Sequence, residues 1–195
     1  MYKPIKRCID FIISLIGLLV LSPIFLLIAV IIKLESKGKV LFKQKRLGKD
    51  KCFFDIYKFR TMLSSTPKDM PTHLLLTPEK FITKSGAFLR KSSLDELPQL
   101  INILVGDMSI VGPRPALWNQ DDLIAEREKV GANDILPGLT GWAQINGRDE
   151  LHIELKAKLD GQYVKEMSLW LDIKIFFLTI FKVFRSEGIQ EGKRQ

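Results

Sequence analysis

The N-terminal part of the chain carries an almost unbroken apolar pattern, whereas the rest alternates between short apolar and polar stretches. From Phe11 to Ile32 only Ser14, Gly17, Ser22 and Pro23 are not strongly apolar. A helix of this length reaches about 33 Å, close to the thickness of the bilayer hydrocarbon core. The run therefore predicts a membrane segment. A secretory signal does not fit, because the run is too long and no small-x-small cleavage pattern follows it.

The basic residues on both sides of this run conflict with a simple crossing. Lys and Arg precede it between Lys3 and Arg7 and follow it between Lys33 and Arg46. Because such residues favour the cytoplasmic side, both flanks are expected there. A helix that enters, bends at Ser22-Pro23 and returns to the same face satisfies both flanks, since proline removes a backbone donor. A simple crossing with a tolerated proline is the alternative, and the pattern leaves both open; either places residues 39–195 in the cytoplasm.

Beyond the apolar run the pattern predicts a small α-rich α+β domain. "LFKQKRLG" and "CFFDIYKFRTM", joined around Gly48–Lys51, indicate paired extended segments or a hairpin. The proline-rich stretch 63–80 indicates a long loop. Helices are expected around Phe81–Lys91, after Asp95 and over residues 120–130, the last rich in charged residues and read as solvated. Glycine and proline punctuate "GDMSIVGPRP", "LPGLTG" and "QINGR".

The stretch "SLWLDIKIFFLTIFKVFR" near the C-terminus has helical periodicity. A basic amphipathic helix with aromatic residues can lie along a membrane surface. A core helix of the domain shows the same periodicity, and the pattern leaves both interpretations open. The apolar face contains Leu169, Ile173, Phe177, Ile180 and Phe184, and the basic face contains Lys174, Lys182 and Arg185.

The formal net charge of +8 is concentrated near the apolar run. Residues 1–60 hold 13 Lys and Arg against 4 Asp and Glu, and the remainder is close to neutral. This placement suits the anionic inner face of a membrane. No nucleic-acid partner is expected, because basic and aromatic residues do not interleave across a domain. Cys8 and Cys52 lack metal-ligand spacing and indicate reduced thiols.

The adjacent acids Asp95 and Glu96, in "KSSLDELPQLINIL", are the candidate chemistry. The two histidines, His73 and His152, are far apart without HExxH spacing, and no phosphate-binding glycine motif is present. One interpretation is that Asp95 caps a helix, which moves Pro98 into the first turn, where proline fits.

The other interpretation is catalytic. A carboxylate at a helix N-terminus is expected to stay ionised and can act as a nucleophile. Neighbouring helical residues point about 100° apart, so Asp95 and Glu96 should have different roles.

A carboxylate that attacks a pyrophosphate needs a divalent cation and fixed guanidinium groups to screen the repulsion between anions. Arg114 lies between Pro113 and Pro115, whose restricted backbone angles favour an extended loop. Arg148 follows Asn146-Gly147, where a backbone can approach a ligand closely. Each cation taken singly is typical of a solvated surface charge. Further candidates are Lys58, Arg60 and Arg90.

Taken together and in order, "LFKQKRLG", "YKFRTM", "SLDELPQLINILVGDMSIVGPRP" and "PGLTGWAQINGR" resemble the bacterial sugar transferase family, specifically its small monotopic phosphoglycosyl transferases. The resemblance covers nearly the whole chain and implies a re-entrant membrane helix broken at Ser22-Pro23. It implies an anchor over residues 1–38, a catalytic domain over residues 39–195 with interfacial helices, and an active site on the cytoplasmic side of the bacterial inner membrane. A homo-oligomer is possible.

The same resemblance implies a UDP-sugar and undecaprenyl phosphate as substrates, with Mg²⁺ near Asp95. Asp95 would attack the sugar-bearing phosphate and release UMP, and undecaprenyl phosphate would then take the sugar phosphate. Glu96 would deprotonate or position the lipid phosphate. Phosphates or the nucleotide would be held by Lys58, Arg60, Arg90, Arg114 and Arg148, with Asp172 as a motif acid of undefined role.

Four points stay open from the sequence. Lys51 stands where the resemblance leads us to expect a glycine, which bears on the shape of the turn. Direct transfer without an enzyme-bound intermediate is a rival mechanism, and a non-enzymatic module that binds anionic lipid is a rival function. The identity of the sugar cannot be read from the loops.

Overall fold

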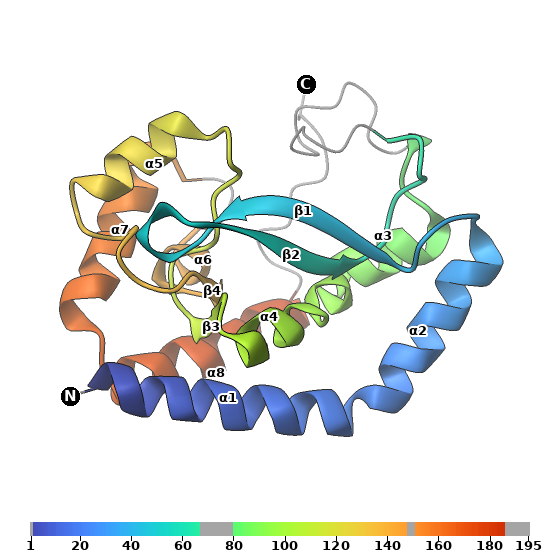
Figure 1. Ribbon diagram of the computed structural model, residues 1–195, viewed down its shortest axis with the longest axis horizontal. Helices are drawn as coiled ribbons and strands as arrows, with labels where there is room; N and C mark the ends of the chain where they lie inside the picture. Colours follow the sequence, from blue (N-terminus) through green and yellow to red (C-terminus); the bar gives the residue numbers. More distant parts are fainter. Residues whose placement is uncertain (1, 67–79, 148–150, 186–195) are drawn as a thin grey trace.

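The structure is a computed structural model that describes residues 2–66, 80–147 and 151–185. Residues 184 and 185 are described as helical backbone only. Figure 1 shows α1 (Tyr2–Val20) along the base of the molecule and α2 (Ser22–Glu35) rising beside it. A β-hairpin crosses the middle, and the remaining helices pack around and below it. The helix-rich α+β class expected from the sequence is confirmed.

Helices α1 and α2 are bent by 60° relative to each other. Pro23 lies in the first turn of α2, where its missing N–H would otherwise have bonded the Leu19 carbonyl. The Ser22 hydroxyl donates to that same carbonyl at 2.8 Å. The predicted break at Ser22-Pro23 is therefore confirmed. Within the described residues no single helix is long and apolar enough to cross a membrane, whereas the bent pair together meets those criteria.

Helix α1 turns its polar residues toward the domain and its apolar residues outward. Lys6, Asp10 and Ser14, spaced four apart on one face, are buried. Asp10 accepts hydrogen bonds from the Ser109 hydroxyl at 2.7 Å and the Ile110 N–H at 3.1 Å. This is the reverse of a soluble amphipathic helix. Exposed large apolar residues of the two helices include Phe11, Ile12, Ile16, Leu19, Val20, Leu26, Leu27, Val30 and Leu34.

The predicted hairpin is present, with β1 (Leu41–Leu47) paired antiparallel to β2 (Phe53–Phe59). The 3₁₀ turn η1 (Lys49–Lys51) joins the strands. Asp50 and Lys51 have φ of 52° and 61°, the left-handed region that favours glycine. This explains why a glycine is expected at position 51, and the chain forms the turn without it.

The segment after the hairpin corrects the capping interpretation. Helix α3 (Lys84–Lys91) is followed by the 3₁₀ turn η4 (Leu94–Glu96), and α4 (Gln99–Val105) begins only after it. Pro98, not Asp95, is the N-cap residue of α4, and no side-chain hydrogen bond caps η4 or α4. The prediction that Asp95 caps the helix is therefore wrong. Ser93, with φ of 56°, turns the chain sharply before the acidic pair.

The C-terminal half supplies the core. The helix expected over residues 120–130 is α5 (Asp121–Glu128). A parallel pair of short strands, β3 (Ser109–Val111) and β4 (Gly138–Thr140), was not predicted. The short α6 (Trp142–Ile145) and α7 (Ile153–Glu166) follow, then α8 (Leu169–Arg185). The main core cluster includes Ile103 of α4, Met108 in the loop before β3, and Val111, Tyr163 and Ile175 from the elements named here.

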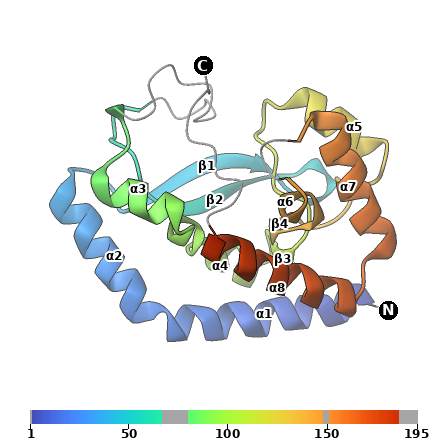
Figure 2. The same ribbon diagram turned by 180° about the vertical axis from the view of Figure 1, so that it is seen from behind.

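Helix α8 lies beside α1 at the base, as Figures 1 and 2 both show. Asp172 and Ile175 face the domain and are buried. The predicted apolar face points away from the domain: Leu169, Ile173, Phe177 and Ile180 are exposed, and Trp170 is 80% exposed. The described part of this face is therefore not a core face.

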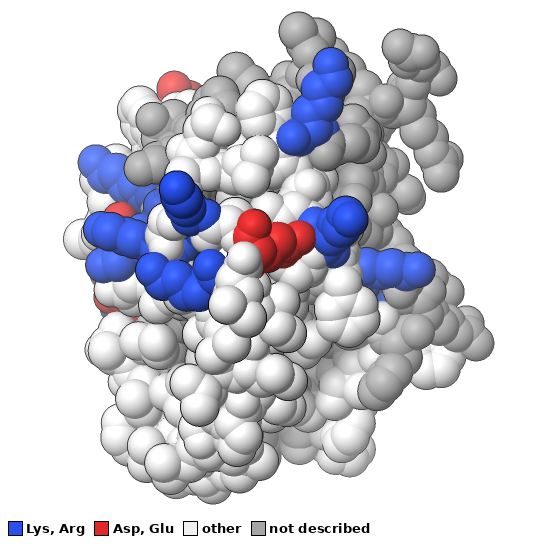
Figure 3. All heavy atoms as spheres, turned by 90° about the vertical axis from the view of Figure 1, so that its right-hand side faces the viewer, with Lys and Arg blue, Asp and Glu red and all other residues white. Residues whose placement is uncertain are grey.

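Charged side chains are unevenly distributed over the face of the molecule that carries α2. Figure 3 shows Lys and Arg gathered across the upper part of the face seen from the right of Figure 1. The lower part of that face, over α2, shows no charged side chain. Lys33, Lys37 and Lys39, at and just after the end of α2, are exposed. A basic zone therefore lies above an apolar base.

Candidate active site

The acidic pair lies in a short turn held from both sides. Leu94 and Leu97 pack on the cluster of Ile28, Ile32, Phe59 and Leu89, and this fixes the turn between α2, α3 and β2. Asp95 and Glu96 are each only 9% exposed. Burial of two adjacent carboxylates is costly unless cations or hydrogen bonds compensate it.

Two cations compensate the buried negative charge of Glu96. Its Oε1 accepts a hydrogen bond from the Lys58 ammonium at 2.7 Å and another from the Arg114 guanidinium at 2.7 Å. Lys58 comes from β2 and Arg114 from the loop after β3. Charge-assisted bonds of this length are among the stronger polar contacts in proteins. Glu96 therefore ties the hairpin to the proline-rich loop.

Asp95 is placed differently. In the described part of the chain its carboxylate accepts no hydrogen bond, and its neighbours act on it through charge. Burial raises the pKa of Asp95, the nearby Glu96 carboxylate adds to this, and Lys58, Arg90 and Arg114 oppose it. The pKa direction is opposite to the one expected from a helix dipole, because burial, with the Glu96 charge, outweighs the three cations.

Three of the predicted cations therefore converge on the acidic pair. Lys58 and Arg114 bond Glu96, while Arg90, in the last turn of α3, acts on Asp95 by charge. Burial lowers the pKa of Lys58, and the Glu96 carboxylate opposes that effect. Anionic groups of a substrate entering this site would meet these three cations beside a carboxylate without a hydrogen-bond partner among the described residues.

Arg60 lies elsewhere. Its guanidinium donates to the Ser36 carbonyl at 2.7 Å and to the Lys37 carbonyl at 2.8 Å, at the C-terminal end of α2. A cation is favourable at this end of a helix. Arg60 therefore joins α2 to the hairpin, and the structure does not bring it to the acidic pair.

Asp172 also lies elsewhere. Its carboxylate accepts hydrogen bonds from Tyr2 at 2.6 Å, from Lys6 at 2.6 Å and from Tyr163 at 2.7 Å. These bonds join α1, α7 and α8. Arg148, the remaining predicted cation, is outside the described residues, as is most of the predicted loop over residues 63–80.

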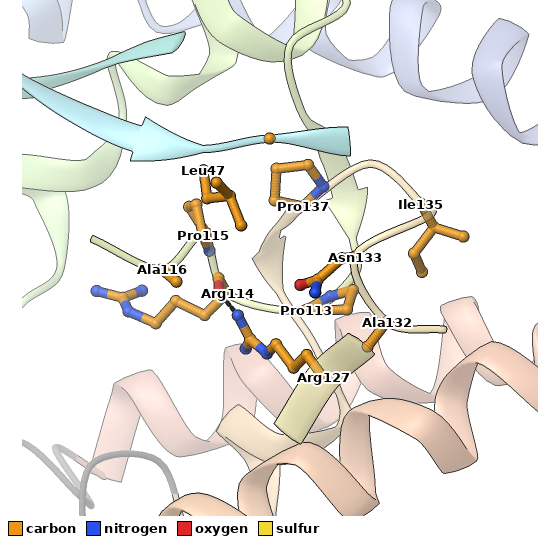
Figure 4. A pocket seen from close by; sticks show the side chains of 11 residues that line it. Leu47, Pro113, Arg114, Pro115, Ala116, Arg127, Ala132, Asn133, Ile135 and Pro137 are labelled. Atoms are coloured by element: carbon orange, nitrogen blue, oxygen red, sulfur yellow. Dashed lines mark hydrogen bonds between the residues drawn. The ribbon is translucent and has the colours of Figure 1, made fainter. Parts of the chain in front are cut away.

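The loop that carries Arg114 borders a small pocket. Figure 4 shows the Arg114 side chain directed away from this pocket, while Arg127 lies beneath the loop. Arg127 is only 3% exposed. It could not be predicted as a site residue, because a charged residue in a polar helix is typical of a solvated position. The lining residues are Leu47, Gly48, Pro113, Arg114, Pro115, Ala116, Arg127, Ala132, Asn133, Ile135 and Pro137.

Among the described residues, no group of three or more His, Cys, Asp or Glu side chains is arranged to hold a metal ion. Mg²⁺ needs fewer protein ligands when a substrate supplies phosphate oxygens, and one or two carboxylates then suffice. Asp95 is the carboxylate of the pair that no cation of the described residues bonds directly, so it fits this kind of metal binding.

Comparison with known proteins gives a consistent result. The model of the family described as "Bacterial sugar transferase" matches residues 1–186. The uncharacterized sugar transferase EpsL of Bacillus subtilis (strain 168) is 43% identical over 187 residues, which cover 96% of this chain and 91% of that protein. The exopolysaccharide production protein ExoY of Rhizobium meliloti (strain 1021) is 36% identical, with 94% and 87% covered.

A longer relative carries a more specific name. The UDP-glucose:undecaprenyl-phosphate glucose-1-phosphate transferase of Escherichia coli (strain K12) is 41% identical over 187 residues. The match covers 92% of this chain but 40% of that enzyme. A family match over nearly the full length, together with an acidic pair set among cations, leads to one conclusion: the chain belongs to the bacterial sugar transferase family and is an enzyme of that family.

Proposed function

We propose that this enzyme transfers a sugar 1-phosphate from a UDP-sugar to undecaprenyl phosphate through a covalent intermediate on Asp95. The substrate classes are supported by the names of its relatives, among them glucose-1-phosphate transferases that use undecaprenyl phosphate. A UDP-N-acetylgalactosamine enzyme from Aeromonas hydrophila is also similar, at 38% identity, so the comparisons do not select one sugar.

The reaction has two steps. An Asp95 carboxylate oxygen attacks the sugar-bearing phosphorus, the bridging P–O bond breaks, and UMP leaves with the bonding electron pair. A phosphate oxygen of undecaprenyl phosphate then attacks the same phosphorus and displaces Asp95. The products are undecaprenyl diphosphate sugar and a regenerated carboxylate, so no net redox change or additional reactant is needed.

The observation that carries this proposal is the difference between the two acids. Glu96 accepts bonds from Lys58 and Arg114 through a single oxygen, while Asp95 accepts none among the described residues. A nucleophile needs an oxygen that is not already bonded, and a positioning acid needs fixed partners. Asp95 is therefore the nucleophile, and Glu96 holds the two cations that face the phosphates.

Mg²⁺ fits the same scheme as a partner of Asp95 and of the substrate's phosphate oxygens. When bound, it would neutralise charge on the diphosphate. Lys58, Arg90 and Arg114 are placed to hold phosphate oxygens near Asp95, because their charges already act on this carboxylate.

We place the apolar base of the molecule in the inner leaflet of the cell membrane, with the acidic pair on the cytoplasmic side. Four features support this: the outward apolar faces of α1, α2 and α8, the polar face that α1 turns inward, the 60° bend, and the exposed lysines after α2. A bent pair that enters and leaves by one face would keep the basic zone among anionic headgroups. The lipid acceptor and the soluble donor would then meet at one surface.

Rapid quenching tests the covalent step. Purified protein in lipid nanodiscs is mixed with Mg²⁺ and a radiolabelled UDP-sugar, without lipid acceptor, and the denatured protein is analysed by mass spectrometry. A sugar phosphate on Asp95, together with a stoichiometric burst of UMP, is expected. A panel of UDP-sugars identifies the donor.

The controls separate the alternatives. Asp95→Asn should abolish both label and UMP release while the protein stays folded. Turnover without label at any quench time would favour direct transfer. Lipid binding without UMP release from any UDP-sugar would refute the enzymatic proposal.

A further inference from the structure

The proline-rich loop that carries Arg114 is held by its backbone carbonyls. Two of them accept backbone N–H groups: the Pro113 carbonyl bonds Gly138 at 2.8 Å and the Ala116 carbonyl bonds Leu47 at 3.0 Å. The two carbonyls between them accept guanidinium groups instead. Prolines lack an N–H, so a loop with two of them is held chiefly through its oxygens.

The two guanidiniums belong to Arg127 and Arg46. Arg127 Nη1 donates to the Arg114 carbonyl at 2.8 Å, and Arg46 Nη1 donates to the Pro115 carbonyl at 3.0 Å. The carbonyl that Arg127 binds therefore belongs to the residue whose side chain bonds Glu96. Figure 4 shows Arg127 beneath the loop and the Arg114 side chain on its other side.

Arg127 is itself fixed. Its Nε and Nη2 donate to Asp160 Oδ2 at 2.8 Å and 2.6 Å, and the two side chains are 4% and 1% exposed. Asp160 lies on α7, which approaches α5 closely because Gly161 leaves room for Val130. A guanidinium with three nitrogens bonded in one plane has little freedom to move.

We infer that Arg127, oriented by Asp160, is a positioning residue that sets where the Arg114 guanidinium meets the substrate phosphate. The pair reaches the site through the backbone of residue 114 and touches no reacting atom itself. A buried ion pair is a weak source of stability compared with apolar packing of the same volume. The bond from Arg127 to the Arg114 carbonyl therefore accounts better for this pair than a contribution to stability does.

Two variants remove the positioning. Arg127→Lys keeps a cation for Asp160 but replaces three bonded guanidinium nitrogens with one nitrogen, so the geometry that orients the loop carbonyl is lost. The double variant Arg127→Met/Asp160→Leu replaces the ion pair with apolar side chains, which is often neutral for stability, and removes the bond to the loop. Lys129→Gln, next to the end of α5, is the matched control, because its ammonium pairs with Glu126 at the surface.

Amide exchange in the full-length protein gives a readout that does not depend on activity. Pro113 and Pro115 have no amide hydrogen, so Arg114, Ala116 and Leu117 report on the loop. Deuterium uptake there should become faster in both variants and stay unchanged in Lys129→Gln. Unchanged uptake in the double variant, with the fold intact, would overturn the inference.

The kinetic readout rests on the proposed function. Arg127→Lys should lower kcat/KM for UMP release by about tenfold to a hundredfold, as expected for a misplaced binding group. In an Arg114→Ala background the same change should cost no more than about twofold, because there is no guanidinium left to position. Equal losses in both backgrounds would show a general effect on stability and overturn the inference. If the wild type releases no UMP, the proposed function fails, and deuterium uptake alone decides the positioning.

Discussion

The two acids of the pair should respond oppositely when each is neutralised. Asp95 and Glu96 are equally buried, at 9% exposure, but of the two only Glu96 has cations bonded to it among the described residues. Glu96→Gln removes two charge-assisted bonds of 2.7 Å and leaves Lys58 and Arg114 without their common counter-ion. Breaking a buried pair from one side costs about 3–5 kcal/mol. The folded state of Glu96→Gln should be destabilised by about that amount.

Asp95→Asn should leave stability within about 1 kcal/mol of the wild type at pH 7, or increase it, because no hydrogen bond to the carboxylate is lost. Burial first, then Glu96, raises the pKa of Asp95. The charged carboxylate is thus disfavoured in the folded state, and its penalty develops as pH rises from the unfolded value, about 3.9, through the folded one. Any stability gain in Asp95→Asn should therefore disappear at low pH.

Chemical unfolding of both variants in the same detergent, at pH 7 and pH 4, measures these differences, and UMP release is followed in parallel. Asp95→Asn should be stable and inactive, whereas Glu96→Gln should be less stable and retain some activity. An Asp95→Asn protein destabilised as strongly as Glu96→Gln would refute the division of roles. Activity in Asp95→Asn would refute its role as nucleophile.

Three further predictions follow from single contacts. Lys58→Met removes a cation that lowers the pKa of Asp95, so the acid limb of the pH–rate profile should move to higher pH; an unmoved limb would assign it to another group. Gly138→Ala would place a Cβ 2.1 Å from the Gly112 nitrogen, so the midpoint of thermal unfolding should fall by several degrees, which calorimetry would contradict if it did not move. Pro23→Ala restores a backbone N–H donor at the bend between α1 and α2. Spin labels at the start of α1 and the end of α2 should therefore move apart, and an unchanged distance would assign the bend to tertiary packing.

Features that depend on local chemistry were predictable from the sequence. The break at Ser22-Pro23 follows from the missing proline N–H and a hydroxyl placed to bond the freed carbonyl. The hairpin follows from two alternating segments around a polar turn. In both cases the cause lies within a few residues of the effect, so no tertiary information is needed.

Features that depend on distant partners were not predictable. Arg60 and Arg127 look like surface cations in the sequence, yet one binds the end of α2 and the other lies beneath the loop of Arg114. Strands β3 and β4 span three residues each, too short for a periodic signal, and they pair only because the glycine-rich backbone segments meet. The capping prediction for Asp95 was wrong because a 3₁₀ turn, held by Leu94 and Leu97, precedes the helix.

Helix α4 connects the apolar base of the molecule to the acidic pair. The α1 residue Arg7 donates to the Ile103 and Leu104 carbonyls at 2.6 Å and 2.9 Å, near the C-terminal end of α4, and Gly17 allows Leu100 to approach α1 closely. The acidic pair directly precedes the other end of α4. Because α1 and α4 are joined at several points along their length, the height of the carboxylates above the apolar face of α1 is fixed by packing. If the apolar face lies in a membrane as proposed, a lipid phosphate at the membrane surface would meet Asp95 at a depth set by this packing.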